Sequence, residues 1–145
     1  MPAGVEVCEP PGTPGIVAVP PLDVVLFEDD DSVRDSLKMM FESHGLTVRD
    51  YPSGTAFFLA GTPPRAGCLV IDYHLPGMNG LELLAKLRGE GIAAPTILIT
   101  GRTKLVTRLR AAAPDALAVL EKPFDAIGLL RLVDTAIGRP EGLRA

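Results

Sequence analysis

Four short segments carry the side chains that could do chemistry, and each of them follows an apolar run. The run Asp23 to Glu28 leads into an acidic cluster, and the run at residues 68–71 leads into Asp72. Two later runs lead into Thr100 and Lys122. Short continuous apolar runs are typical of strands buried on both faces of a parallel sheet. Because ligands bind at the carboxyl ends of such strands, we expect these polar groups to converge at one edge.

The converging groups predict a metal-assisted reaction with a phosphoryl group. Carboxylates of the acidic cluster at residues 28–31 would lie close to Asp72, and at such distances they repel one another. A hard divalent cation such as Mg²⁺ relieves this repulsion and also takes a phosphate oxygen as a ligand. The ammonium group of Lys122 and the hydroxyl of Thr100 could then hold other oxygens of the phosphoryl group. Together they predict phosphoryl transfer onto a carboxylate.

Taken singly, each of these residues has an ordinary structural explanation. An acidic cluster after a strand usually forms a solvated helix N-terminus, where the helix dipole favours negative charge. An aspartate before a Pro-Gly turn is usually a turn residue, a threonine suits a strand, and a lysine is usually a surface charge. Only the combination of the four favours the chemical interpretation.

Strand-like and helix-like patterns alternate between residues 22 and 138. The predicted strands are Asp23 to Glu28, Leu46 to Tyr51, Cys68 to Ile71, Thr96 to Thr100 and Ala116 to Leu120. Two helices are predicted by their bounds, Thr55 to Ala60 with Ser53 as its N-cap and Leu105 to Ala112. Three more are predicted by their apolar faces: Val33, Leu37, Met40 and Phe41; Leu81, Leu84 and Leu87; and, after Asp125 as N-cap, Ile127, Leu130, Val133 and Ile137. Five strand–helix pairs indicate an α/β fold, in which right-handed crossovers place helices on both faces of a parallel sheet.

Length and composition set limits on the function. The chain has 145 residues, enough for one domain, with 47% hydrophobic and 22% charged residues and a net charge of −4. Its lysines and arginines are scattered, so direct nucleic-acid binding is not expected. Cys8 and Cys68 lack metal-ligand spacing, and Cys68 is expected to be a small buried hydrophobe in a reduced, cytoplasmic protein.

The two ends of the chain differ in composition from the predicted domain. Residues 1–21 are rich in Pro and Gly and predict a flexible leader. Five prolines between Pro10 and Leu22 exclude a membrane helix there, and no basic flank indicates a signal peptide. The predicted domain spans residues 22–138, followed by a short tail at 139–145.

Four segments of the sequence together resemble the receiver domain of response regulators in two-component signalling. These segments are VVLFEDDDSVRDSL, CLVIDYHLPGMNGLELL, TILITG and VLEKPF. They occur in the family's order and at compatible distances, and the resemblance covers residues 22–138. It implies the flavodoxin-like (CheY-like) fold, with five parallel strands in the order 2-1-3-4-5.

The resemblance also implies a set of metal-binding positions. Asp72 corresponds to the phosphoacceptor and would bind Mg²⁺ together with Asp29. Glu28 would act on the metal through bound water, and His74 would offer its backbone carbonyl. Three of these positions are the acids that the strand pattern had already brought together.

Further positions would bind or modulate the phosphoryl group. Thr100 corresponds to the switch hydroxyl and Lys122 to the lysine that pairs with the phosphoryl group, with a cis bond before Pro123. His74 and Arg102 border the route of attacking water in this family. They could slow hydrolysis, or they could be solvent-facing side chains.

The sequence departs from the family pattern at three places. Glu28 stands where the family more often has Asp, which should matter little. Val119 stands three residues before Lys122, where an aromatic switch residue is usual. Residues 113–116 replace a small-residue motif before the fifth strand. We therefore expect phosphorylation to displace residues 101–113 without an aromatic rotamer switch.

The resemblance implies a single-domain receiver that switches a partner-binding surface and is not an enzyme, apart from self-phosphorylation and slow autodephosphorylation. A histidine kinase or histidine phosphotransfer protein would supply the phosphoryl group, and the output would be an unidentified partner or a second copy of the chain. One alternative is a pseudo-receiver that binds partners without phosphorylation. Another is a phosphatase of the haloacid-dehalogenase type, but that mechanism needs an acid where the chain has His74.

Overall fold

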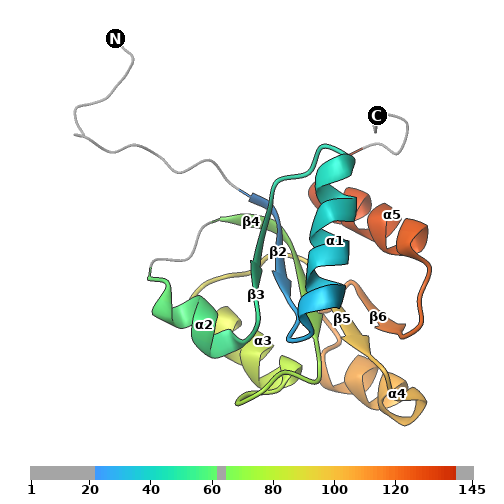
Figure 1. The fold of residues 1–145 in the computed structure, drawn as a ribbon. Coiled ribbons are helices and arrows are strands. Elements are labelled where there is room, and N and C mark those ends of the chain that lie inside the picture. The colour runs from blue at the N-terminus through green and yellow to red at the C-terminus, as the bar shows by residue number, and fades with distance from the viewer. Residues whose placement is uncertain (1–21, 62–64, 140–145) are drawn as a thin grey trace.

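The computed structural model describes residues 22–61 and 65–139, in which strands and helices alternate (Figure 1). The predicted leader and most of the predicted tail lie outside the described residues. The strands are β2 (Leu22–Phe27), β3 (Val48–Tyr51), β4 (Ala66–Asp72), β5 (Thr96–Thr100) and β6 (Ala118–Glu121). The helices are α1 (Asp31–Ser43), α2 (Gly54–Leu59), α3 (Gly80–Gly89), α4 (Thr103–Ala112) and α5 (Ala126–Ile137).

All five strands are parallel and form one sheet in the order β3-β2-β4-β5-β6. Counted along the chain, this is the order 2-1-3-4-5, which confirms the predicted fold. The register aligns the carboxyl ends of the strands, since Phe27 lies opposite Ile71 and Thr100 lies opposite Glu121. The polar residues after these strands therefore share one edge of the sheet.

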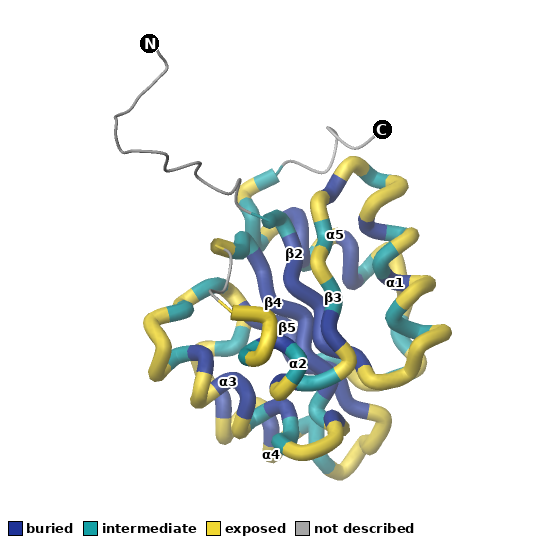
Figure 2. The backbone as a smooth tube through the Cα atoms, turned by 60° about the vertical axis from the view of Figure 1, so that its left-hand side comes forward, coloured by how far each residue is buried: buried dark blue, intermediate teal, exposed yellow. Residues whose placement is uncertain are grey.

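Helices cover both faces of the sheet: α1 and α5 lie on one side, and α2, α3 and α4 on the other (Figure 1). Side chains alternate along each strand, so that β2 sends Val24 and Leu26 toward α1 and α5, and Val25 and Phe27 toward the opposite layer. The central strands are buried and the outer helix faces exposed (Figure 2).

Cys68 is buried, and this burial raises the pKa of its thiol to about 12. It is therefore the small core residue that the sequence predicted.

Side-chain caps fix where the helices begin. The predicted caps Ser53 and Asp125 accept hydrogen bonds from backbone N–H groups of their own helices. Asp30 caps α1 in the same way, and Asn79 forms a capping box with Glu82 at the start of α3. These caps hold the N-termini of α1 and α3 beside the ends of β2 and β4.

The prediction misplaces one core residue, and several predicted strand and helix bounds differ from the observed ones by one or two residues. Ile127 is not on the buried face of α5, because the buried stripe is centred on Leu129 and Val133 and leaves Ile127 45% exposed at its margin. The last strand begins at Ala118 rather than Ala116, because the N–H of Ala116 donates to the Ala113 carbonyl and closes a turn.

Among the described residues, no helix is long and apolar enough to cross a membrane.

Candidate functional site

Three carboxylates meet where β2 and β4 end side by side. Glu28 directly follows β2 and Asp72 is the last residue of β4, and both are buried, with exposed fractions of 2% and 3%. Asp29 is exposed beside them, and each of the three offers an oxygen within 4.8 Å of the others. Such a group of hard oxygen ligands, carrying excess negative charge, fits a divalent cation of the Mg²⁺ type.

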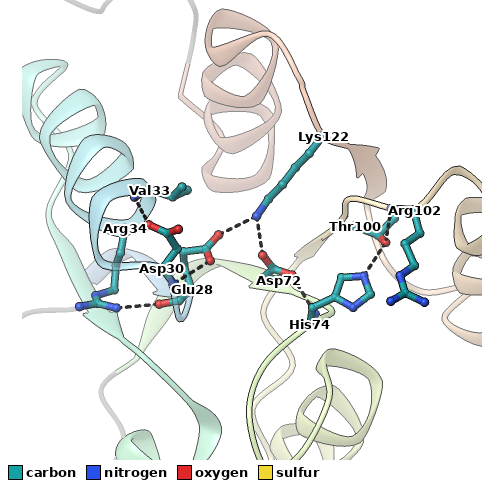
Figure 3. Close-up of polar contacts among 9 residues, drawn as sticks. All are labelled: Glu28, Asp30, Val33, Arg34, Asp72, His74, Thr100, Arg102 and Lys122. Carbon is teal, nitrogen blue, oxygen red and sulfur yellow. Dashed lines mark hydrogen bonds and ion pairs between the residues drawn. The ribbon is translucent and has the colours of Figure 1, made fainter.

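An ammonium group bridges the two buried carboxylates (Figure 3). The Nζ atom of Lys122, in the loop after β6, lies 3.0 Å from Glu28 Oε1 and 2.7 Å from Asp72 Oδ2. The peptide bond between Lys122 and Pro123 is cis. The structure thus brings Lys122 across the sheet edge to residues that precede it by 94 and 50 positions.

The pKa of the Glu28 carboxyl is raised from 4.5 to about 7. Burial is the largest cause and the nearby charge of Asp72 adds to it, while hydrogen bonds from the Asp30 N–H and from Lys122 act in the opposite direction. Desolvation lowers the pKa of Lys122, but its hydrogen bonds to Asp72 and Glu28 and their charges outweigh that effect and raise it. With three carboxylates and one ammonium group, the site carries excess negative charge.

Backbone groups hold Asp72 in place from the other side. The N–H of His74 donates to Asp72 Oδ1 over 2.8 Å, so that both carboxylate oxygens have a donor. Helix α3 starts against this turn at Gly80, where an added Cβ would lie 2.8 Å from Tyr73 Cα and 2.9 Å from the Asp72 carbonyl oxygen. A glycine is needed here because the neighbouring atoms belong to the backbone.

The Thr100 hydroxyl lies at the end of β5 and is fully buried. It accepts a hydrogen bond of 3.1 Å from the N–H of Arg102, and it makes a second bond of 3.1 Å with Nε2 of His74. In Figure 3 the imidazole points toward Thr100, whereas the backbone of the same residue binds Asp72. The Arg102 side chain is exposed.

Sequence reasoning missed the role of Arg34 in this site. Its guanidinium donates to the Glu28 carbonyl over 2.9 Å and forms ion pairs with Asp31 and Asp50. Arg34 thereby connects the acidic cluster at residues 28–31 to α1 and β3. The sequence offered one indication of this role, an arginine one turn into a helix that begins with acidic residues. Its partners could not be predicted, because they lie in the loop after β2, in α1 and in β3. The bond between the His74 and Thr100 side chains was also missed, because the two residues are 26 positions apart.

The position where the family usually carries an aromatic switch residue holds the aliphatic side chain of Val119. Val119 is buried on β6 and belongs to the same core cluster as Leu109 and Ala113 of the α4 region. The unusual loop at residues 113–116 is fixed by an ion pair of 3.1 Å between Asp115 and Arg88. At the other end of α4, the Thr103 hydroxyl donates to Glu121.

Comparisons with known proteins show which family the chain is similar to. Residues 24–134 match the family model described as the response regulator receiver domain. The transcriptional regulatory protein FixJ of Azorhizobium caulinodans is 40% identical over 118 residues, covering 81% of this chain and 56% of FixJ. The C4-dicarboxylate transport transcriptional regulatory protein DctR of Rhodobacter capsulatus is 31% identical, covering 82% of this chain and 61% of DctR. The chain thus spans little more than half the length of these curated relatives.

Solved structures show the same fold. The receiver domain of the Francisella response regulator 1452 superposes with a TM-score of 0.69 at 26% identity, covering 79% of this chain and 95% of that domain. The strand order found in this chain is therefore that of a fold shared with a receiver domain.

Proposed function

The chain belongs to the response regulator receiver family, and from this premise we propose that Asp72 accepts a phosphoryl group from a histidine kinase or a histidine phosphotransfer protein. In the transfer, an Asp72 carboxylate oxygen attacks the phosphorus of a phosphohistidine. The new O–P bond forms as the N–P bond breaks, and the donor imidazole keeps the electron pair and takes up a proton. The unit that carries this function is the domain at residues 22–138.

The observation that carries this proposal is the position of Lys122. Its ammonium group contacts Asp72 Oδ2 and Glu28 Oε1 from one side, while the N–H of His74 orients Asp72 from the other. A phosphoryl group on Asp72 brings roughly 1.5 to 2 negative charges, which Lys122 is placed to pair with. The N–H of His74 fixes the orientation of the acceptor before and during the transfer.

We further propose that the three carboxylates hold a magnesium ion. Asp29 and Asp72 would bind it directly with the backbone carbonyl of His74, and Glu28 would act through bound water. Burial and the charge of Asp72 raise the pKa of Glu28, and the three carboxylates carry more negative charge than Lys122 alone can offset, which supports this assignment. When bound, the cation neutralises charge on the phosphoryl oxygens.

The output is proposed to be a change of surface around α4. In the phosphorylated state the Thr100 hydroxyl would move toward the phosphoryl group, and residues 101–113 would follow it. Val119 is β-branched and has few rotamers, so the displacement would involve backbone and helix rather than a rotating ring. The responding partner would be a second protein or a second copy of this chain.

Self-phosphorylation with acetyl phosphate tests the acceptor. The wild-type chain, incubated with acetyl phosphate and Mg²⁺, should gain one phosphoryl group in its intact mass. Asp72→Asn should gain none, whereas Asp115→Asn, a change of the same chemistry on a distant exposed loop, should behave as wild type. An adduct that persists on Asp72→Asn contradicts the assignment of the acceptor.

Magnesium titration tests the ligand roles. Asp29→Asn should weaken Mg²⁺ binding about a hundredfold, because a direct ligand loses its charge, and Glu28→Gln only about tenfold. Equal losses, or a larger loss for Glu28→Gln, would reverse the assignment of the direct and the water-mediated acid.

A further inference from the structure

We propose that the His74 imidazole is a positioning residue that holds the Thr100 hydroxyl in its unphosphorylated place and competes with the phosphoryl group for it. The inference deepens the proposed function and rests on it, because it supposes a phosphoryl group on Asp72. It concerns the side chain of His74, whereas the metal-binding role proposed above concerns its backbone carbonyl.

The contacts of Thr100 carry this inference. Its hydroxyl is fully buried at the end of β5, and it accepts the N–H of Arg102 over 3.1 Å. Its second hydrogen bond is with Nε2 of His74, also over 3.1 Å. A buried hydroxyl that gives up a hydrogen bond without replacing it costs free energy, so the imidazole stabilises this position of Thr100.

His74 is an exposed residue, but its backbone and its ring each have a contact that restrains them. The N–H of His74 donates to Asp72 Oδ1, and the ring packs edge-on against Tyr73, with ring centroids 4.9 Å apart and an interplanar angle of 88°. A restrained ring loses little side-chain freedom when it bonds the hydroxyl. The same residue thus binds the proposed acceptor through its backbone and the switch hydroxyl through its side chain.

The bond opposes the proposed switch for a simple reason. The Thr100 hydroxyl must leave its place at the imidazole to approach a phosphoryl oxygen beside Asp72, and it then loses this bond whichever of the two groups donates the hydrogen. The free energy of the His74–Thr100 bond is therefore subtracted from that of the phosphorylated conformation. Removing the bond while keeping the bulk of the ring should favour that conformation.

The test is the affinity for beryllofluoride, which stands in for the phosphoryl group, in the full chain saturated with Mg²⁺. His74→Phe keeps a flat ring but cannot bond the hydroxyl, and it should bind beryllofluoride about fivefold more tightly, the equivalent of one ordinary hydrogen bond. His74→Gln places an amide group, which can donate or accept a hydrogen bond, near the position of Nε2 and should restore the wild-type affinity. In a Thr100→Val background, His74→Phe should have no effect.

The outcomes separate this inference from the function on which it rests. Unchanged or weaker binding by His74→Phe overturns it, and so does a gain that persists in Thr100→Val, because the effect would then come from ring size or water access. If the wild-type chain with Mg²⁺ does not bind beryllofluoride, the proposed function fails and the inference fails with it. Thermal midpoints check folding, and His74→Leu replaces His74→Phe if the latter does not fold.

Discussion

Polar and charged groups are arranged differently at the two edges of the sheet. At the amino edge, where the strands begin, donors meet acceptors. The Asp23 carboxylate accepts the N–H of Thr47 over 2.8 Å, and the Thr47 hydroxyl accepts the N–H of Asp23 over 2.9 Å. Arg88 donates to Asp115, to the Ile92 carbonyl and to the Thr96 hydroxyl. These contacts connect neighbouring strands and helices and satisfy the groups that take part.

At the carboxyl edge, like charges are gathered instead. Glu28 and Asp72 are buried next to each other with Asp29 close by, and the pKa of Glu28 rises to about 7 as a result of burial and the charge of Asp72. Lys122 reduces the repulsion, since it contacts both buried acids.

The different arrangement of charges at the two edges predicts different contributions to folding stability. Residues at the amino edge should contribute to the free energy of unfolding without affecting phosphorylation. Residues at the carboxyl edge should be needed for phosphorylation. In the metal-free protein, the buried acids there should lower the free energy of unfolding, and Lys122 should offset part of that loss. A buried ionisable group whose pKa is strongly shifted beside charged partners is a common sign of a functional site.

The largest effect is expected from Lys122→Met, which keeps the aliphatic stem and removes the ammonium group. Two buried carboxylates then face each other, and we expect a loss of about 3 kcal/mol in the free energy of unfolding at pH 8 without Mg²⁺. Phosphorylation should also be lost. Urea unfolding measures the first and intact mass the second. Lys104→Met on the exposed face of α4 is the control, and equal stability of the two variants would contradict the role given to Lys122.

Glu28→Gln should have the opposite sign. The folded protein binds a proton on Glu28 more tightly than the unfolded chain, with a pKa of about 7 against 4.5, so the stability of the wild type falls as pH rises through this window. The shift corresponds to at most about 3 kcal/mol, and we expect Glu28→Gln to be about 2 kcal/mol more stable than wild type at pH 8 without Mg²⁺.

That advantage should disappear near pH 4.5, where Glu28 is protonated in the folded wild type. Urea unfolding at both pH values is the measurement. A variant that is less stable than wild type at pH 8 would show that the Lys122 contact outweighs the burial of the charge.

A matched pair of glycine substitutions gives the smallest effect and the sharpest comparison. In Gly67→Ala at the amino edge, the new Cβ would meet Ile137 Cγ2 at 2.6 Å, and in Gly80→Ala it would meet Tyr73 Cα at 2.8 Å. Each should cost about 1–2 kcal/mol in urea unfolding. Only Gly80→Ala should slow self-phosphorylation, because it displaces the backbone of Asp72. If both variants are slowed equally, the two edges are not independent.

Local patterns predicted much of this molecule. The strand Thr96–Thr100 has the predicted bounds, and the caps Ser53 and Asp125 have the predicted role, because strand burial and helix capping depend on nearby residues. The mistaken placement of Ile127 shows the limit of such patterns. An apolar residue at the margin of a helical stripe is buried only if the neighbouring element reaches it.

The sequence by itself determined which polar groups follow which strands, and therefore that Glu28, Asp72, Thr100 and Lys122 share one edge of the sheet. Only the tertiary structure decided which of these groups touch. Lys122 contacts two acids at once, and the imidazole of His74, an exposed residue, bonds the buried hydroxyl of Thr100. Such contacts join residues from different strands, and they depend on side-chain rotamers and loop positions that are fixed only when the helices pack on the sheet.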